Sequence, residues 1–516
     1  MESIDEKKEL DTTVGSRETG EEQIDVLDDL SHASKLRRAF LLFLFAFSFF
    51  IDAFITSGTI ISITAIASHF NQPANIASWL VTAYTLTFGS FLLLSGRISD
   101  MYNPKYIFIG GMLIVGIFSV GGGFLQNIIG LIIFRAIQGI GASMTIPSAT
   151  LMLTKAYPGP TEKGIALTLF AAAGTSGICA AFVAGGAIVQ FTTWRWTWWL
   201  VGCISLPMAI LSLLLIPGRQ VRSQIKSQRL DIPGVFFLTS SIILLIFAFS
   251  QAPTVGWATA RVLAPLIISV ALILAFLWWQ TRLPEDTALI PPKMWFIPNF
   301  LVLVFVSFCT QIYLTAPILV YTEYWPVAYS WTPFTVGLHV LPMGITSVVV
   351  CTVLPYFILQ LPPRLGLLGA NLMAGLFSIL LVFADTRERF WSFIVPAMIL
   401  ITLGSTSAYI ISNVGLITSV PPEKVGVASA IFSAAQQAGG AVNIAIITTI
   451  LVQVQEKNPY PSYRAPRAVF YYIIALGVVQ AVLVFVLFRP QSSQKAASPP
   501  LAASASPDSE PLPQKP

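Results

Sequence analysis

Charged residues are scarce in this chain of 516 amino acids. Asp, Glu, Lys and Arg make up only 10% of it, whereas soluble domains carry about 25%. Its four cysteines lie inside apolar runs without a Cys-x-x-Cys pair, which argues against a disulfide framework or a zinc site. No nucleophile constellation appears, and the net charge of +5 is spread over the connections. We therefore expect no enzyme, no metal or other cofactor, and no nucleic-acid partner.

Long apolar runs account for most of the sequence. Hydrophobic residues make up 55% of the chain, and a helix needs about 20 mostly apolar residues to cross about 30 Å of hydrocarbon. Fourteen such runs start near Ala39, Ile76, Tyr106, Leu131, Gly164, Trp198, Gly234, Arg261, Phe300, Phe334, Leu365, Phe390, Val425 and Ala468. The sequence therefore predicts an all-α polytopic membrane protein with 14 transmembrane helices.

The charge of the connections predicts the orientation of these helices. If the N-terminus is cytoplasmic, most Lys and Arg residues of the connections, such as Lys105, Lys163 and Arg222, face the cytoplasm, as the positive-inside rule requires. Nearly half of the 24 acidic residues precede Ser31, which is typical of a solvated, disordered tail. Because the number of helices is even, both tails are expected inside.

A repeated segment divides the chain into two halves. Pro160 and Pro422 each open an apolar run with a Glu-Lys pair followed by Gly and Ala, and paired halves around a midplane cavity are a common transporter plan. We expect a disordered acidic cytoplasmic tail (1–38), a six-helix bundle (39–216), a cytoplasmic linker (217–233), two extra helices (234–281), a second six-helix bundle (282–488) and a disordered cytoplasmic tail (489–516).

Two charged residues lie deep in apolar runs of the first half. Asp52 is expected about 20 Å along the first helix, counted from Ala39 at 1.5 Å per residue. The fourth helix enters the membrane from the outside, and Arg135 is expected at a similar depth in it. Intramembrane ionisable groups are expensive and are functional candidates by default. The two could pair, and burial together with a nearby Arg could poise the carboxyl to exchange a proton. A fixed structural ion pair is the alternative.

Small residues recur four apart in the fifth run. This spacing lets two helices approach closely. The residues are Ala173, Gly177, Ala181 and Gly185, with Gly186 directly after them. We expect a packed helix here that acts as a hinge.

The first half resembles the major facilitator superfamily. The connection with Gly96, Asp100 and Lys105 resembles its cytoplasmic loop signature, although Asn103 and Pro104 replace the usual Gly-Arg. Within the fourth run, the segment from Arg135 to Gly141 matches the family pattern Arg-x-x-Gln-Gly-x-Gly at every named position.

Three further segments resemble the 14-helix drug:proton antiporters of this superfamily. The fifth run resembles the antiporter signature, with Ala181 and Phe182 in place of its Gly-Pro pair. The segment around Asp52 resembles the Leu-Asp-x-Thr segment, and Leu230 to Gly234 resembles the opening of the seventh helix. The resemblance covers roughly residues 37–488. Within it, the segment around Phe50 to Lys105 is most similar to fungal members.

This resemblance implies a proton-coupled efflux carrier for small amphiphilic compounds that works by alternating access. Asp52 and Arg135 would couple the proton, the loop of Gly96, Asp100 and Lys105 would form a cytoplasmic gate, and the fifth helix would act as the hinge. Polar residues that could line the substrate cavity are Gln138, Gln311, Tyr313, His339, Asn413 and Gln436. Structural hydrogen bonding between helices explains most of these six nearly as well.

Alternatives remain within and outside this class. One is an uptake or facilitative carrier for ammonium, borate or a siderophore, and another is a membrane receptor or scaffold that does not transport. The expected partners are a small-molecule substrate, protons and the lipid bilayer. We expect a monomer in the plasma membrane, with the vacuolar membrane as the alternative.

Overall fold

The computed structural model describes residues 34–72, 74–216, 231–284, 288–353, 357, 361–421 and 424–489. Within these ranges the regular secondary structure is helical, without strands, and 14 helical spans are long and apolar enough to cross a membrane. The predicted all-α membrane architecture is therefore confirmed. The predicted tails lie almost entirely outside the described residues, as does most of the linker at 217–233, so the domain boundaries stay predictions.

Two groups of helices follow one another along the chain. The first half contains α3 (Lys35–His69), α4 (Ala74–Ala77), α5 (Trp79–Met101), α6 (Pro104–Phe124), α7 (Ile128–Ala156), α8 (Pro160–Ala180), η1 (Ala181–Gly185), α9 (Gly186–Phe191) and α10 (Arg195–Leu215). The accessory helices are α11 (Ile232–Val255) and α12 (Ala260–Gln280). The second half contains η2 (Pro292–Phe296), α13 (Phe300–Thr310), α14 (Ile312–Tyr329), α15 (Pro333–Val353), α17 (Pro363–Leu376), α18 (Ile379–Val382), η3 (Arg387–Arg389), η4 (Phe390–Ile394), α19 (Val395–Thr418), α20 (Val425–Lys457) and α21 (Arg464–Leu487).

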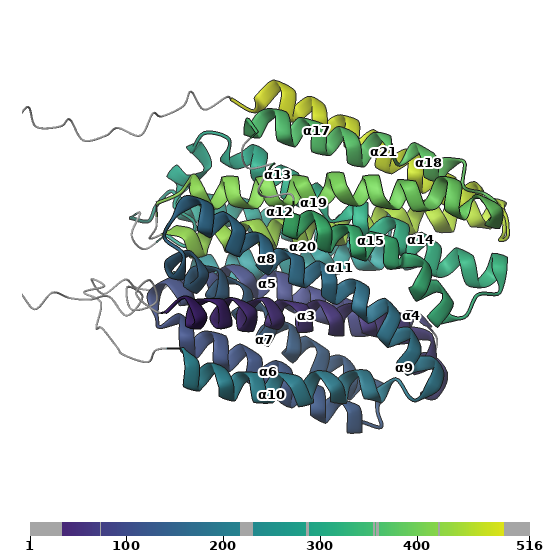
Figure 1. Cartoon of the computed structure of the whole chain (residues 1–516), viewed down its shortest axis with the longest axis horizontal. Helices are drawn as coiled ribbons and strands as arrows, with labels where there is room; N and C mark the ends of the chain where they lie inside the picture. Colours follow the sequence, from purple (N-terminus) through teal and green to yellow (C-terminus); the bar gives the residue numbers. More distant parts are fainter. Residues whose placement is uncertain are drawn as a thin grey trace, which may run out of the picture.

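The two halves form neighbouring bundles of long helices (Figure 1). In the first bundle α5 packs on α7 and α3 packs on α8, while in the second α17 packs on α19 and α21. The most extensive contacts between the bundles are those of α5 with α20 and of α8 with α15. The beginning of α3 and the end of α21 lie at the same end of the molecule (Figure 1), as an even number of spans requires.

The first helix begins four residues earlier than its apolar run. Ser34 precedes it, and the Ser34 hydroxyl accepts a hydrogen bond of 3.3 Å from the backbone N–H of Arg37. Such a cap satisfies an N–H group that has no partner within the helix. The Arg37 guanidinium in turn donates to the carbonyl of Leu215 at the end of α10, at 3.0 Å. Polar contacts at the membrane surface therefore extend the helix beyond its hydrophobic segment.

The accessory helices are fastened at a buried aspartate. Asp231 caps α11 by accepting from the N–H of Gly234 at 2.8 Å. It also accepts from the side chains of Trp279 at 2.9 Å and Gln280 at 2.6 Å, both near the end of α12. Helix α11 packs on α5 and on α20, so it contacts both halves.

We expect single-cysteine labelling to confirm the orientation. In a variant whose four native cysteines are replaced by serine, Tyr102→Cys lies in the connection of α5 and α6, and Lys457→Cys lies at the far end of α20. Both native side chains are exposed. A membrane-impermeant maleimide should label Lys457→Cys on intact cells and Tyr102→Cys only after permeabilisation. Labelling of both positions on intact cells would contradict this topology.

Candidate functional site

Asp52 lies near the middle of α3, and only 7% of its surface is exposed. Its carboxylate oxygen Oδ1 accepts a hydrogen bond from the hydroxyl of Tyr84 on α5. The backbone carbonyl of Asp52 accepts a further bond of 2.9 Å from the hydroxyl of Thr56. A residue of the neighbouring helix α5 thus holds the carboxyl group inside the first bundle. Its burial agrees with the depth expected from the sequence.

Arg135 is fully buried in α7. Its Nε donates to the carbonyl of Leu80 at 2.9 Å, and its Nη1 donates to Oε1 of Gln138 at 3.2 Å. Gln138 donates through Nε2 to the hydroxyl of Ser119 at 2.9 Å. Gln138 therefore supports Arg135 and joins α7 to α6, which is a structural role beside its predicted place in a cavity.

Tyr84 connects the two charged residues. The guanidinium carbon of Arg135 lies 4.1 Å from the centre of the Tyr84 ring, a distance typical of a cation–π contact. The ion pairs among the described residues do not include Asp52 with Arg135. The direct contact that the sequence suggested is therefore replaced by a chain of three side chains. Tyr84 was missed because a tyrosine in an apolar run carries no signal of its own.

Asp100 joins the two halves at the predicted cytoplasmic end. Its Oδ2 accepts a hydrogen bond of 3.1 Å from the N–H of Val427 in the first turn of α20, where a negative charge is favourable. A Cβ atom on Gly96 would lie 2.6 Å from the Cβ of Ala430 and 3.1 Å from the carbonyl oxygen of Gly426. Glycine is thus needed at this position for α5 to approach α20 so closely.

Lys105 has a different role from the one expected in a gate. Its ammonium group donates to the carbonyls of Leu213 at 2.8 Å and Ile216 at 2.6 Å. These carbonyls lie at the end of α10, where a cation is favourable. Lys105 therefore ties α6 to α10 within the first half, while Gly96 and Asp100 face the second half.

The predicted hinge helix contains a π-helical turn. The turn η1 occupies Ala181–Gly185, where the antiporter signature has its Gly-Pro pair. Such turns locally widen and bend a helix. A Cβ on Gly337 of α15 would overlap with the carbonyl oxygen of Phe182 in this turn. Although Ala181 and Phe182 replace the Gly-Pro pair, the helix is still irregular at this place. The irregular turn contacts α15 of the second half.

The small residues of the hinge helix have unequal surroundings. A Cβ on Gly177 would overlap with the carbonyl oxygen of Phe50 on α3. A Cβ on Gly185 would lie 3.5 Å from the Cα of Gly58, which is an ordinary contact. On Gly186 it would lie 3.0 Å from the carbonyl oxygen of Pro333, at the start of α15. Gly177 therefore serves packing within the first half, and Gly186 serves the contact between the halves.

A family model described as Major Facilitator Superfamily matches residues 42–444. The chain belongs to the major facilitator superfamily. It is 28% identical to the puromycin resistance protein pur8 of Streptomyces alboniger over 83% of this chain and 86% of that protein. It is 24% identical to the low affinity ammonium transporter of Saccharomyces cerevisiae over 78% and 80% of the two chains. The human organic anion transporter MFSD10 has the same fold, with a TM-score of 0.61 and 11% identity over 88% of this chain and 100% of that chain.

Membership in the major facilitator superfamily identifies the chain as a secondary transporter and not an enzyme. In the second half of this transporter, the predicted cavity residues are dispersed. Gln311 lies at the break between α13 and α14, and interrupted helices are a recurrent feature of transporter binding sites. Tyr313 instead donates to Oε1 of Gln480 on α21 at 2.6 Å and is buried, which favours a packing role.

The remaining three cavity candidates also differ from one another. His339 contacts an aromatic cluster, with its ring centre 3.9 Å from that of Trp331 and 4.6 Å from that of Phe390. These contacts are made within the second half, apart from Asp52. Asn413 and Gln436 are half-buried on α19 and α20. Their part in a cavity stays a prediction.

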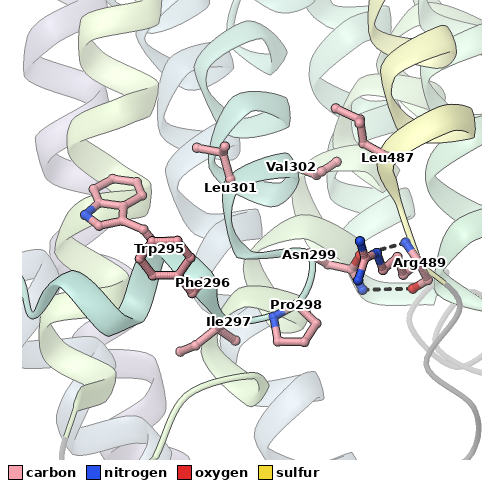
Figure 2. A pocket seen from close by; sticks show the side chains of 9 residues that line it. All are labelled: Trp295, Phe296, Ile297, Pro298, Asn299, Leu301, Val302, Leu487 and Arg489. Atoms are coloured by element: carbon pink, nitrogen blue, oxygen red, sulfur yellow. Dashed lines mark hydrogen bonds between the residues drawn. The ribbon is translucent and has the colours of Figure 1, made fainter.

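A pocket of about 260 Å³ opens where η2 leads into α13 and α21 ends (Figure 2). Asn299 and Arg489 close one side, since the Asn299 side chain donates to the Arg489 carbonyl at 2.9 Å and accepts from its N–H at 2.8 Å. Phe296 and Leu301 on the other side are largely exposed. The predicted site residues do not line this pocket.

The unequal surroundings of Gly177 and Gly185 predict different outcomes for the same substitution. Gly177→Ala would push α8 away from α3, and overpacking of this kind costs about 1–3 kcal/mol. We expect a lower Tm and loss of transport in Gly177→Ala, with the protein still in the membrane. Gly185→Ala is the matched control and should keep both properties. Equal behaviour of the two variants in thermal melts and transport assays would show that the α3–α8 contact is not limiting.

Proposed function

We propose that this transporter exports small amphiphilic compounds in exchange for protons. The observation that carries the proposal is the buried assembly of Asp52, Tyr84 and Arg135 in the first bundle. An ionisable group inside a membrane protein is costly and is a functional candidate by default, and here the carboxyl is held near a cation without a direct ion pair. The similarity to a puromycin resistance protein supports export of a drug-like compound.

The contacts between the halves support alternating access. Asp100 binds the start of α20 at one end of the molecule. At the other end Gly186 lies against Pro333, and the rings of Phe191 and Phe334 have centres 6.0 Å apart. A substrate can pass only if these two contacts open in turn. Rocking of one bundle against the other around a central site is how such carriers work.

Both bundles are present in one chain, so we propose that the monomer is the working unit. We propose the plasma membrane as its location, because export from the cell requires it. Transport of a compound into the vacuole would have the same chemistry, and localisation of the tagged protein distinguishes the two membranes.

A second candidate is uptake of a small cation such as ammonium. The similarity to a low affinity ammonium transporter favours it, at nearly the same coverage as the drug-resistance relative. Uptake and export are distinguished by the direction of net flux in cells that lack or overproduce the protein. Lower internal puromycin with overproduction supports export, whereas faster ammonium entry supports the second candidate.

Asp52→Asn tests the coupling role most directly. The amide is nearly isosteric and its oxygen can still accept from Tyr84, but it cannot ionise. In inside-out vesicles with an acidic lumen, we expect uphill accumulation of a transported compound such as puromycin to be lost. Exchange of the compound without a gradient should persist. Arg135→Lys should also be impaired, because an ammonium cannot replace a planar guanidinium. Uphill transport at the wild-type level in Asp52→Asn would refute the coupling role.

A further inference from the structure

Tyr84 contacts both charged residues of the proposed coupling site. It is 1% exposed, its hydroxyl donates to Asp52, and its ring covers the guanidinium of Arg135. We propose that Tyr84 is a positioning residue that keeps Asp52 and Arg135 from closing into a direct ion pair, so that Asp52 can bind and release a proton. The proposal rests on the proposed function of Asp52 as the coupled carboxyl group.

The two parts of the Tyr84 side chain have different effects on Asp52. The hydroxyl group donates one hydrogen bond, and hydrogen bonding to a carboxylate favours its ionised form. The ring keeps the guanidinium away, whose direct pairing with the carboxylate would favour the ionised form more strongly. A carboxylate locked in such a pair would not take up a proton in the working range of pH. The hydroxyl therefore adjusts how readily Asp52 is protonated, and the ring keeps Asp52 free of a direct ion pair with Arg135.

Arg135 retains a hydrogen-bond donor that a carboxylate could fill. Its Nη2 is buried and has no hydrogen-bond partner among the described residues, whereas Nε and Nη1 are both paired. A buried donor without a partner is destabilising. Without the Tyr84 ring, the guanidinium would gain by turning this donor toward Asp52. In this proposal, the Tyr84 ring is therefore the group that prevents a direct ion pair between Arg135 and Asp52.

The other titratable groups on the helices that pack against α3 do not act on the Asp52 carboxyl as Arg135 does. Arg135 is the charged residue that acts electrostatically on Asp52. The remaining charged groups of these helices lie in their first or last turns, and the two thiols face α15 or the exposed surface. These groups are Arg97, Asp100, Lys155, Glu162, Lys163, Arg195, Cys179 and Cys203.

Tyr84→Phe and Tyr84→Leu separate the two effects. The first removes only the hydroxyl, so protonation of Asp52 should shift to higher pH by about one unit. The second removes the ring as well, so Arg135 can reach Asp52 and protonation should shift to lower pH than in the wild type. Phe88→Leu is the matched control. Phe88 stacks on Tyr84 one turn along α5, with ring centres 5.8 Å apart, and its loss should leave the midpoint unchanged.

The readout is infrared difference spectroscopy of the purified full-length protein in lipid during a pH titration. The protonated-carboxyl band of Asp52 is assigned by its absence in Asp52→Asn, and this needs no substrate. Opposite shifts in the two Tyr84 variants support the proposal. Shifts in the same direction, no shift in either variant, or a wild-type Asp52 that never titrates would overturn it.

Failure of this inference is distinguishable from failure of the proposed function. If Asp52→Asn abolishes uphill transport but Tyr84→Phe and Tyr84→Leu titrate like the wild type, Asp52 couples protons without help from Tyr84. If Asp52→Asn transports normally, the coupling role itself is wrong, whatever the titration shows.

Discussion

The burial of the Arg135 guanidinium is the constraint on which the first bundle depends. A cation in the membrane interior is tolerated only where protein groups replace water. Here the Leu80 carbonyl, the Gln138 side chain and the Tyr84 ring do so. These partners come from α5 and α7, so the two helices must lie close together. A Cβ on Gly139 would lie 2.5 Å from the carbonyl oxygen of Tyr84, which explains the glycine within the Arg-x-x-Gln-Gly-x-Gly pattern.

Close backbone contact between the two halves is also relevant to the movement that we propose for them. Gly96 allows α5 to touch α20, while Gly186 and Gly337 allow the predicted hinge helix to touch α15. Small residues at these positions let the helix backbones approach closely. The carboxylate of Asp100 adds hydrogen bonding to the backbone at the start of α20. Close approach of helix backbones at both ends is compatible with the rocking motion that we propose.

Hydropathy and charge were sufficient to predict the 14 spans, because the thickness of the bilayer sets their length. They also indicated Asp52 and Arg135, since an ionisable residue in an apolar run stands out. They did not indicate Tyr84, which contacts both, because it looks like any aromatic residue of a membrane helix. Nor could local sequence predict that Lys105 binds carbonyls more than 100 residues away, or that a π turn lies at Ala181–Gly185. These features depend on tertiary packing, which sequence spacing does not report.

Coupled proton movement is the central claim, and proton flux driven by a substrate gradient tests it most directly. The purified protein would be reconstituted in liposomes with a pH-sensitive dye inside and without an imposed pH gradient. A compound that the vesicle assay shows to be transported would then be added outside. The account predicts that entry of the compound drives protons out, so the lumen becomes alkaline. Acidification of the lumen, or uptake of the compound without any change in pH, would contradict proton exchange.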